Sequence, residues 1–338
     1  MELIHLKKRV ITGVIMALIL VPVLLVPSLT KLTEVIIFLF VIVASIELLN
    51  MYDKEKKMHI SLKIMTVILT VGLYSGMVAS YQGSFNYLHD IGAISEGKDY
   101  VTLIYKVFER MHIAKVATPL NSLAISFIII MATMVLNHDL SVPDVGKIFT
   151  CILYVGICAG AFTVLWFAGV RFIIYLLIVS TATDIFAYFF GMAFGKHKMA
   201  PYISPKKTWE GAIGGTVSAV ILGFLFLFFY ENIACLVDAI PHNNFFVGFF
   251  AFDTFSTPGK VVFILLLTLA ISICSQIGDL IASKLKRNYG IKDYSNIFPG
   301  HGGILDRFDS AFFASAVFLV FIMIEQNLFP LLQSSGLI

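Results

Sequence analysis

The sequence predicts an all-α, polytopic integral membrane protein with about nine transmembrane helices and an active site at the cytoplasmic face. First, 59% of the 338 residues are hydrophobic and 13% are charged, whereas a soluble domain is about a quarter charged. Second, apolar runs of roughly 20 residues, the length that spans a bilayer, recur along the chain. Third, residues 283–309 form a hydrophilic stretch of Lys, Arg, Asp, His and Gly between two such runs.

The apolar runs predict where the membrane spans lie. The first run follows Lys7, Lys8 and Arg9 as in a signal peptide, but it is long enough to span the bilayer and lacks a small-residue cleavage site. We therefore treat it as a span. The nine predicted spans are residues 10–28, 33–51, 62–81, 119–136, 148–167, 172–193, 210–230, 260–282 and 310–330.

The basic residues predict the orientation of the chain. With the N-terminus in the cytoplasm, 17 of the 24 Lys and Arg residues lie in inner loops and 7 lie outside, as the positive-inside rule expects. Nine spans then place both polar loops, 194–209 and 283–309, on the cytoplasmic side of the plasma membrane. We divide the chain into an N-terminal membrane region, 1–170, and a C-terminal catalytic region, 171–338.

Three features outside the polar loops have a weaker bearing on function. Residues 82–118 form an outer excursion with helical apolar spacing around 104–111, which predicts either an amphipathic surface helix or a short packing helix. The net charge of +3 gives no reason to expect nucleic-acid binding. The four cysteines have no metal-ligand spacing and are expected to be small core residues.

The stretch 283–309, which we call the signature stretch, combines groups that bind phosphate with groups that bind metal. Basic side chains and glycine backbone suit phosphate. Asp306 and Asp309, three residues apart at a helix start, share one face and suit a hard cation such as Mg²⁺. Asp306 could instead cap the helix, and Asp309 could be a ligand, a holder of a basic side chain or a base. His301 serves either the glycine turn or a phosphate nest.

Asp279 lies at the inner end of an apolar span. Ser272, Gln276, Asp279 and Ser283 recur at helical spacing and form one polar stripe. A carboxylate at membrane depth costs at least about 2.5 kcal/mol, so it needs a partner or a role. Asp279 is either a metal ligand that faces Asp306 and Asp309 or an interfacial carboxylate in contact with water.

The loop 194–209 and the start of the following helix carry a second basic group. Ser204, Lys206, Lys207 and Glu210 follow one another closely. One interpretation is that the two lysines only reflect the basic character of inner loops. The alternative is that they bind phosphates. Glu210 is expected to pair with a lysine or to face the metal.

Asp184 is a further candidate because it lies deep in a predicted span. Such a carboxylate marks a functional site by default. The alternative is a helix–helix hydrogen bond with Thr181 or Tyr188.

The signature stretch resembles, position by position, that of the phosphatidate cytidylyltransferases, also called CDP-diacylglycerol synthases. A Ser-Gln-x-Gly-Asp element ending at Asp279 and a Ser-Pro-Lys-Lys-Thr-x-Glu-Gly element at 204–211 resemble the same family. The specific resemblance covers roughly residues 180–310. The matching residues of the signature stretch are Ser283, Leu285, Lys286, Arg287, Lys292, Asp293, Ser295, Phe298, Pro299, His301, Gly302, Gly303, Ile304, Asp306, Arg307, Phe308 and Asp309.

The resemblance implies an enzyme of phospholipid biosynthesis that transfers the cytidylyl group of CTP to phosphatidic acid, giving CDP-diacylglycerol and pyrophosphate. It implies a metal centre held by Asp279 and Asp306, and it suggests a homodimer. We expect Mg²⁺ with a second cation there, and we include Asp309 with these two aspartates as an expected catalytic and metal-binding residue. The alternatives are a CTP-dependent lipid kinase of the polyprenol or phytol type and, in another class, an ion-coupled transporter. The expected substrate-binding residues are Ser204, Lys206, Lys207, Glu210, Lys286, Arg287, Lys292, His301 and Arg307, with Asp184 and Gln276 as further candidates.

Overall fold

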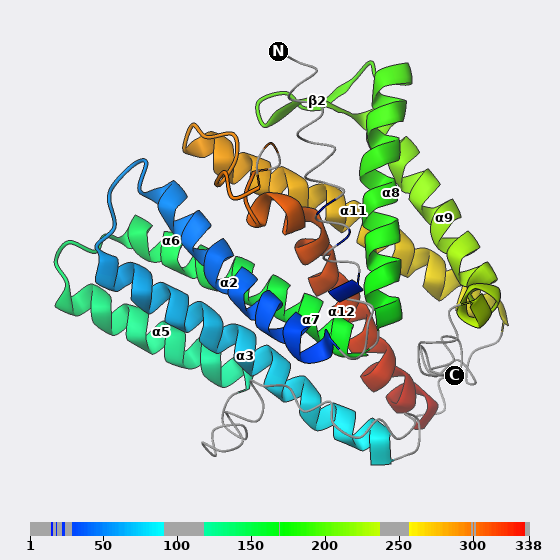
Figure 1. The fold of residues 1–338 in the computed structure, drawn as a ribbon, viewed down its shortest axis with the longest axis horizontal. Helices are drawn as coiled ribbons and strands as arrows, with labels where there is room; N and C mark the ends of the chain where they lie inside the picture. Colours follow the sequence, from blue (N-terminus) through cyan, green and yellow to red (C-terminus); the bar gives the residue numbers. More distant parts are fainter. Residues whose placement is uncertain are drawn as a thin grey trace. The chain divides into compact units, whose positions relative to one another are not determined.

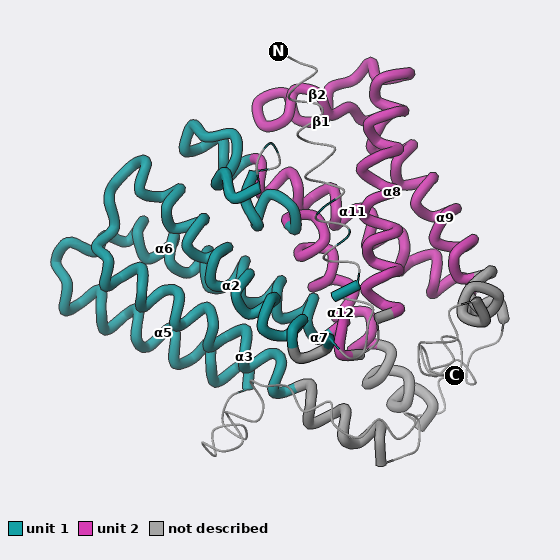
Figure 2. The backbone as a smooth tube through the Cα atoms, viewed as in Figure 1, with its two compact units in different colours: residues 1–90, 97–164, 284–308 teal, residues 91–96, 165–283, 309–338 magenta. Residues whose placement is uncertain are grey.

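The computed structural model divides into two compact units, each described by itself (Figure 2). Unit 1 comprises residues 1–90, 97–164 and 284–308, and unit 2 comprises residues 91–96, 165–283 and 309–338. The signature stretch therefore falls mainly in unit 1. The structure describes residues 15, 18, 22, 23, 29–90, 118–168, 170–236, 257–298, 300 and 302–334.

Helices make up nearly all of this part of the chain (Figure 1). Eight helical segments among the described residues are long and apolar enough to cross a membrane, and they match eight of the nine predicted spans. The predicted first span, 10–28, lies almost entirely outside the described residues. The helices are α2 (Thr30–Tyr52), α3 (Ile60–Asp90), α5 (Pro119–Leu136), α6 (Val142–Cys151), η2 (Ile152–Ile157), α7 (Cys158–Ala168), α8 (Val170–Phe194), α9 (Trp209–Leu236), α11 (Thr257–Asn288) and α12 (Leu305–Ser334).

Two loops differ in detail from a simple chain of spans. Helix α3 continues to Asp90, so it includes the first part of the predicted excursion 82–118, while the amphipathic segment near 104–111 lies outside the described residues. The loop 194–209 contains an antiparallel hairpin of β1 (Lys198–Ala200) and β2 (Ser204–Thr208). This hairpin is a small departure from an all-α fold. Pro205, which lacks an N–H and restricts its own backbone, disfavours a helix there.

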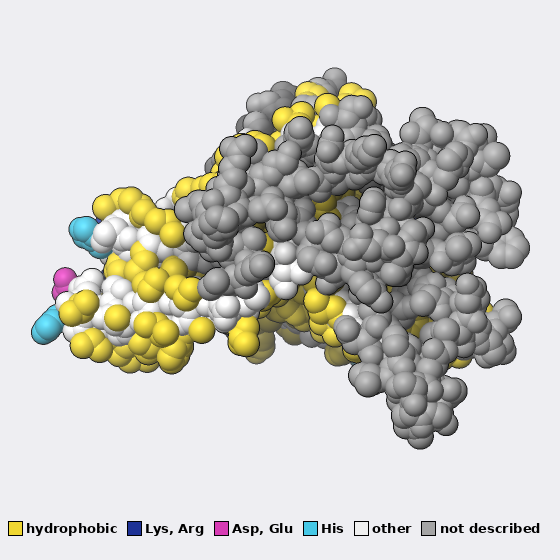
Figure 3. Space-filling view, turned by 90° about the horizontal axis from the view of Figure 1, so that it is seen from below, with side chains coloured by type: hydrophobic (Ala, Val, Ile, Leu, Met, Phe, Trp, Pro, Cys, Tyr) yellow, Lys and Arg dark blue, Asp and Glu magenta, His cyan; other side chains and the backbone are white. Residues whose placement is uncertain are grey.

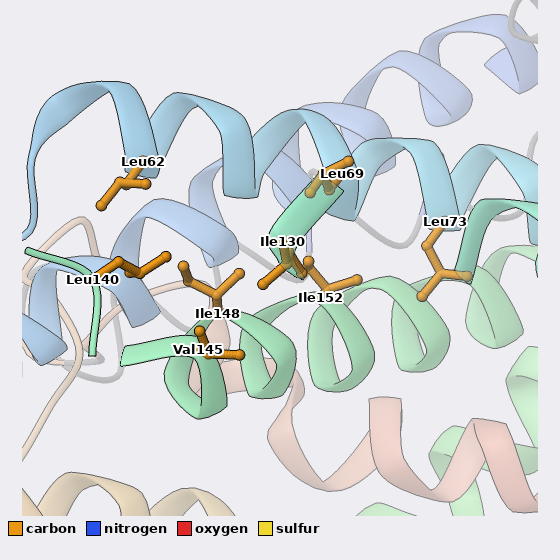
Figure 4. Close-up of a cluster of buried hydrophobic side chains, with 8 residues drawn as sticks. All are labelled: Leu62, Leu69, Leu73, Ile130, Leu140, Val145, Ile148 and Ile152. Carbon is orange, nitrogen blue, oxygen red and sulfur yellow. The ribbon is translucent and has the colours of Figure 1, made fainter. Parts of the chain in front are cut away.

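Unit 1 is built around apolar contacts among α3, α5, α6 and η2. Leu62, Leu69 and Leu73 recur along one face of α3, as expected for a buried helical stripe. The π-helical turn η2 joins α6 to α7, so the three segments form one span. Figure 4 shows the cluster, which comprises Leu62, Leu69, Leu73, Ile130, Leu140, Val145, Ile148 and Ile152.

Unit 2 depends on close packing of α8 against α9. A Cβ added to Gly211 would lie 2.5 Å from the backbone oxygen of Ala187, and one added to Gly215 would lie 2.5 Å from that of Thr183. These contacts leave no room for a side chain, so the glycines permit the two helices to approach. The close approach positions the hairpin that joins the end of α8 to the start of α9.

Apolar side chains also cover much of the described surface. On α5, Leu120, Ile128, Val135 and Leu136 are between 65% and 82% exposed. Figure 3 shows hydrophobic side chains spread over one described face. A soluble monomer rarely exposes so large an apolar area, so this surface is consistent with a protein that meets lipid.

Candidate functional site

In unit 1 the signature stretch forms a tight loop between the last turn of α11 and the first turn of α12. Gly290, Gly300 and Gly302 have φ values of 64°, 79° and 84°, which glycine adopts without a steric penalty. Phe298 and Gly302 exchange two backbone hydrogen bonds, of 2.9 and 3.1 Å. We call residues 289–304 the signature loop.

Asp306 organises this loop from the first turn of α12. Its Oδ1 atom forms an ion pair with Lys286 Nζ at 2.6 Å, with the two side chains 2% and 10% exposed. Its Oδ2 atom accepts hydrogen bonds from the backbone N–H groups of Tyr294, at 2.7 Å, and Gly303, at 2.9 Å. The carboxylate therefore ties α11, the loop and α12 together.

Glu47 of α2 contacts the same loop. Its Oε1 atom accepts from Ser295 Oγ at 2.5 Å and from the N–H of Ile304 at 3.0 Å, and Oε2 accepts from the N–H of Leu305 at 2.9 Å. The residue is only 3% exposed. We did not predict Glu47 from the sequence, although a carboxylate inside an otherwise apolar span was a signal that could have identified it.

The remaining basic residues of the signature stretch lie at the surface of unit 1. Arg287 donates to the backbone oxygen of Ile291 at 2.8 Å. Lys292 and Arg307 are exposed, so their charges are available to an anion. His301 lies outside the described residues.

A cavity of about 390 Å³ opens between the end of α2 and the signature loop, entirely within unit 1. Most of its lining residues are polar, so it suits a polar ligand group better than an acyl chain. The lining residues are Asn50, Met51, Lys54, Ile291, Asp293, Tyr294, Ser295 and Asn296.

In unit 2 the hairpin lysine and the span aspartate meet. Lys207 Nζ lies 2.5 Å from Asp279 Oδ2, with the side chains 26% and 33% exposed. Ser283 Oγ donates to Asp279 Oδ1 at 3.4 Å. Asp184 is close enough to interact electrostatically with both Asp279 and Lys207. Three predicted site residues from α8, β2 and α11 are thus brought together.

The other residues of the polar stripe on α11 hold helices together. Gln276 donates to Thr216 Oγ1 at 2.9 Å and to the backbone oxygen of Ala212 at 3.4 Å. Ser272 exchanges a hydrogen bond with Thr183 at 2.8 Å. In this structure Gln276 therefore contacts α9, and the stripe positions Asp279 by packing α11 against α8 and α9.

Glu210 has a partner that the sequence did not suggest. Its carboxylate lies 2.6 Å from His197 Nδ1 and accepts from the His197 N–H at 3.1 Å, where we expected a lysine or a metal. This contact closes the base of the hairpin. Ser204 and Lys206 lie on β2, with Lys206 exposed.

Asp309 is buried in unit 2, 7% exposed. Its Oδ1 atom accepts from the N–H of Ser310 at 2.8 Å. A Cβ added to Gly278 would lie 2.8 Å from the backbone oxygen of Asp309 and 2.7 Å from Phe313 Cβ. Glycine beside Asp279 therefore lets α11 pass directly against the start of α12.

The donor types fit a hard cation. No group of three or more His, Cys, Asp or Glu side chains among the described residues is arranged to hold a metal. The carboxylate of Asp279 and the hydroxyl of Ser283 are nonetheless oxygen donors of the kind Mg²⁺ takes with one or two carboxylates. Asp306 uses three of its roughly four acceptor positions, so a cation there would displace Lys286. Asp279 belongs to unit 2 and Asp306 to unit 1.

Comparison with known proteins gives a consistent result. Residues 7–325 match the model of the cytidylyltransferase family. The phosphatidate cytidylyltransferase of Staphylococcus haemolyticus is 32% identical over 308 residues, which cover 91% of this chain and 95% of that protein. The phosphatidate cytidylyltransferase of Bacillus subtilis is 36% identical over 222 residues, 65% of this chain and 72% of that protein. The predicted resemblance is confirmed, and the chain belongs to the cytidylyltransferase family.

Proposed function

We propose that this protein is a phosphatidate cytidylyltransferase, which transfers the cytidylyl group of CTP to phosphatidic acid. The observation that carries this conclusion is the similarity over nearly the full length of the Staphylococcus haemolyticus enzyme. The ion pairs of Lys207 with Asp279 and Lys286 with Asp306 support it, because both combine a phosphate-binding group with a metal-binding group.

In the proposed reaction, an oxygen of the phosphatidate phosphate attacks the α-phosphorus of CTP. A bond forms between that oxygen and the α-phosphorus, and the bond from the α-phosphorus to the bridging oxygen of the β-phosphate breaks. The electron pair leaves with pyrophosphate. A phosphate monoester is already largely ionised at pH 7, so no strong protein base is required. The protein contributes positioning and charge neutralisation.

Basic side chains hold the triphosphate and the departing pyrophosphate. Lys206, Arg287 and Lys292 are exposed and form no ion pair within the described part of the chain, so they are available to the nucleotide. Lys207 and Lys286 are paired with aspartates, so each must exchange a carboxylate for a phosphate oxygen. In the exchange each lysine gains a phosphate partner and each aspartate becomes free to hold a cation, which keeps the charges balanced.

Asp279, Asp306 and Asp309 would hold Mg²⁺ together with a second cation. Bound Mg²⁺ would neutralise charge on the phosphate oxygens. The chain's own residues orient the groups around it: Ser283 donates to Asp279, and the N–H groups of Tyr294 and Gly303 orient Asp306.

We further propose that the enzyme lies in the plasma membrane and crosses it nine times. Its N-terminus and its active site then face the cytoplasm. The described helices supply eight candidate spans, and the apolar run at 10–28 would supply the ninth. The excess of Lys and Arg in the inner loops supports this orientation, which puts the site on the side where CTP is found. A homodimer remains part of the proposal.

The test follows two labels of CTP separately. Purified protein is given phosphatidate, Mg²⁺ and CTP labelled at the α- or the γ-phosphate. We expect the α-label to enter the lipid and the γ-label to leave as pyrophosphate. Transfer of the γ-label to an added lipid alcohol would instead identify a lipid kinase. If CTP neither binds nor reacts, an ion-coupled transporter would be the better interpretation. Asp279→Asn and Asp306→Asn should abolish turnover while the protein stays folded.

A further inference from the structure

Helix α2, in the half of the chain where we predicted no site residues, contacts the signature loop at several points. Tyr52 of α2 packs edge-on against Tyr289, with 5.2 Å between the ring centroids. Asn50 and Met51 line the cavity beside the loop. Glu47 precedes them on the same helical face, since residues three and four apart are neighbours on a helix.

Glu47 makes the most specific of these contacts. It accepts three hydrogen bonds from residues 248 to 258 positions further along the chain. One partner, Ser295, lies midway along the loop, and the other two, Ile304 and Leu305, lie where the loop ends and α12 begins. A single carboxylate therefore joins the middle of the loop to its C-terminal end.

The chain makes room for this carboxylate. A Cβ added to Gly303 would overlap Glu47 Oε1. Gly303 is not among the described glycines with positive φ, so its backbone conformation is open to other residues. The absence of a side chain at residue 303 serves the approach of Glu47 and not a turn.

The burial of Glu47 shows that the contact is costly to lose. A carboxylate that is 3% exposed needs hydrogen-bond donors to offset the loss of water. Its described donors are two N–H groups at the start of α12, where the helix dipole also favours a negative charge, and one hydroxyl. Removing the carboxylate leaves these buried donors without an acceptor.

We propose that Glu47 is a positioning residue: it holds the signature loop closed against α2, so that Asp306 and the basic residues of the loop are in place for the reaction. Glu47 itself does not touch the substrate. The link to turnover rests on the proposed cytidylyl transfer, but the tether between α2 and the loop can be tested without substrate.

The test is limited tryptic cleavage of the detergent-solubilised full chain, with the cut after Lys292 identified by mass spectrometry. Lys292 is exposed within the loop, and cleavage of a transiently opened segment follows the population of the open form. We expect Glu47→Gln to speed this cut at least ten-fold. Ser295→Ala, which removes one of the three donors, should speed it by a smaller factor.

A matched control lies on the same helix. Glu34 is also 3% exposed in α2. Glu34→Gln makes the same change to a buried carboxylate 13 residues before Glu47, which is about 20 Å along the helix axis. We expect it to leave the Lys292 cut within two-fold of the wild-type rate. Equal acceleration by both variants would mean a general loosening of unit 1 and would overturn the proposal.

Gly303 provides a second test that does not depend on one variant folding well. Gly303→Ala alone should speed the Lys292 cut, because its Cβ collides with Glu47 Oε1. In a Glu47→Ala background the collision is gone, so Gly303→Ala should add less than two-fold. Full additivity of the two changes would show that the residues act independently and would refute the tether.

Turnover is measured on the same variants. We expect kcat/KM to fall at least ten-fold in Glu47→Gln and to stay near wild type in Glu34→Gln. A faster cut with unchanged cytidylyl transfer would refute the positioning role while leaving the proposed function intact. If the wild type itself transfers no cytidylyl group, the proposed function fails, and the cleavage contrast still decides the tether.

Discussion

The ion pair of Lys286 and Asp306 leads to a quantitative prediction about Lys286→Met. Methionine is close in length to the lysine stem, so it can keep the contact with the Tyr294 ring, whose centroid lies 5.1 Å from Lys286 Nζ. The substitution leaves Asp306, whose side chain is 2% exposed, without its cation. Removing one partner of a buried pair costs about 3–5 kcal/mol.

The hydrogen bonds that remain place the expected cost at the lower end of this range. Asp306 keeps the N–H groups of Tyr294 and Gly303, which offset part of the charge, so we expect a loss of about 3 kcal/mol. With an unfolding entropy of about 2.1 cal/mol/K per residue, a chain of 338 residues should then lose about 4 °C in its unfolding midpoint. Adding Asp306→Asn removes the buried charge and should recover about 1–2 kcal/mol.

The assay is thermal unfolding of each variant in the same detergent. Lys284→Met is the matched control, because Lys284 is an exposed lysine two residues earlier on α11, and it should change stability by no more than about 0.5 kcal/mol. Equal midpoints for Lys286→Met and Lys284→Met would refute the reasoning. So would a double variant that loses the sum of the two single losses, because the two residues would then not be coupled.

Three further predictions concern unit 2 and the cation. Lys207→Met should raise the KM for CTP at least five-fold in steady-state kinetics, because it removes the ammonium group that pairs with Asp279 and that we expect to bind phosphate. Lys198→Met on the same hairpin, measured in the same assay, should leave the KM unchanged. Gly211→Ala should lower the unfolding midpoint, because its Cβ would meet the Ala187 oxygen at 2.5 Å. Gly72→Ala, with open space around it, should be neutral or gain up to about 1 kcal/mol in the same thermal assay. Chelation of divalent cations should abolish turnover and excess Mg²⁺ should restore it; full activity of the chelated enzyme would exclude the metal role.

The spans could be predicted because they depend on local properties of the sequence. A bilayer requires about 20 apolar residues in a row, and α5 begins and ends at the predicted residues 119–136. The hairpin at 198–208 was missed because its pairing depends on where α8 ends and α9 begins. Short polar loops carry no length or periodicity signal of comparable strength.

The residues of the candidate site could be predicted from the sequence, but the ion pairs among them could not. We assigned Lys207 and Lys286 to phosphate and Asp279 and Asp306 to metal, whereas in the structure each lysine contacts an aspartate. Motifs identify residue types, while the partners of a buried charge follow from the tertiary fold. The same reason explains Glu47, whose nearest loop partner is 248 residues away in sequence.

The partners of Glu47 and Asp306 explain why two carboxylates at one loop should have different roles. In the described part of the chain, Glu47 accepts hydrogen bonds from two N–H groups and a hydroxyl, and none of these donors carries a charge that a ligand could replace. Asp306 holds a lysine, and a divalent cation can take the place of that charge without leaving the carboxylate unpaired. Exchange of partners is therefore open to Asp306, while Glu47 gains nothing from giving up its donors. This difference predicts that added Mg²⁺ will stabilise Lys286→Met more than the wild type, while it will not compensate for Glu47→Gln.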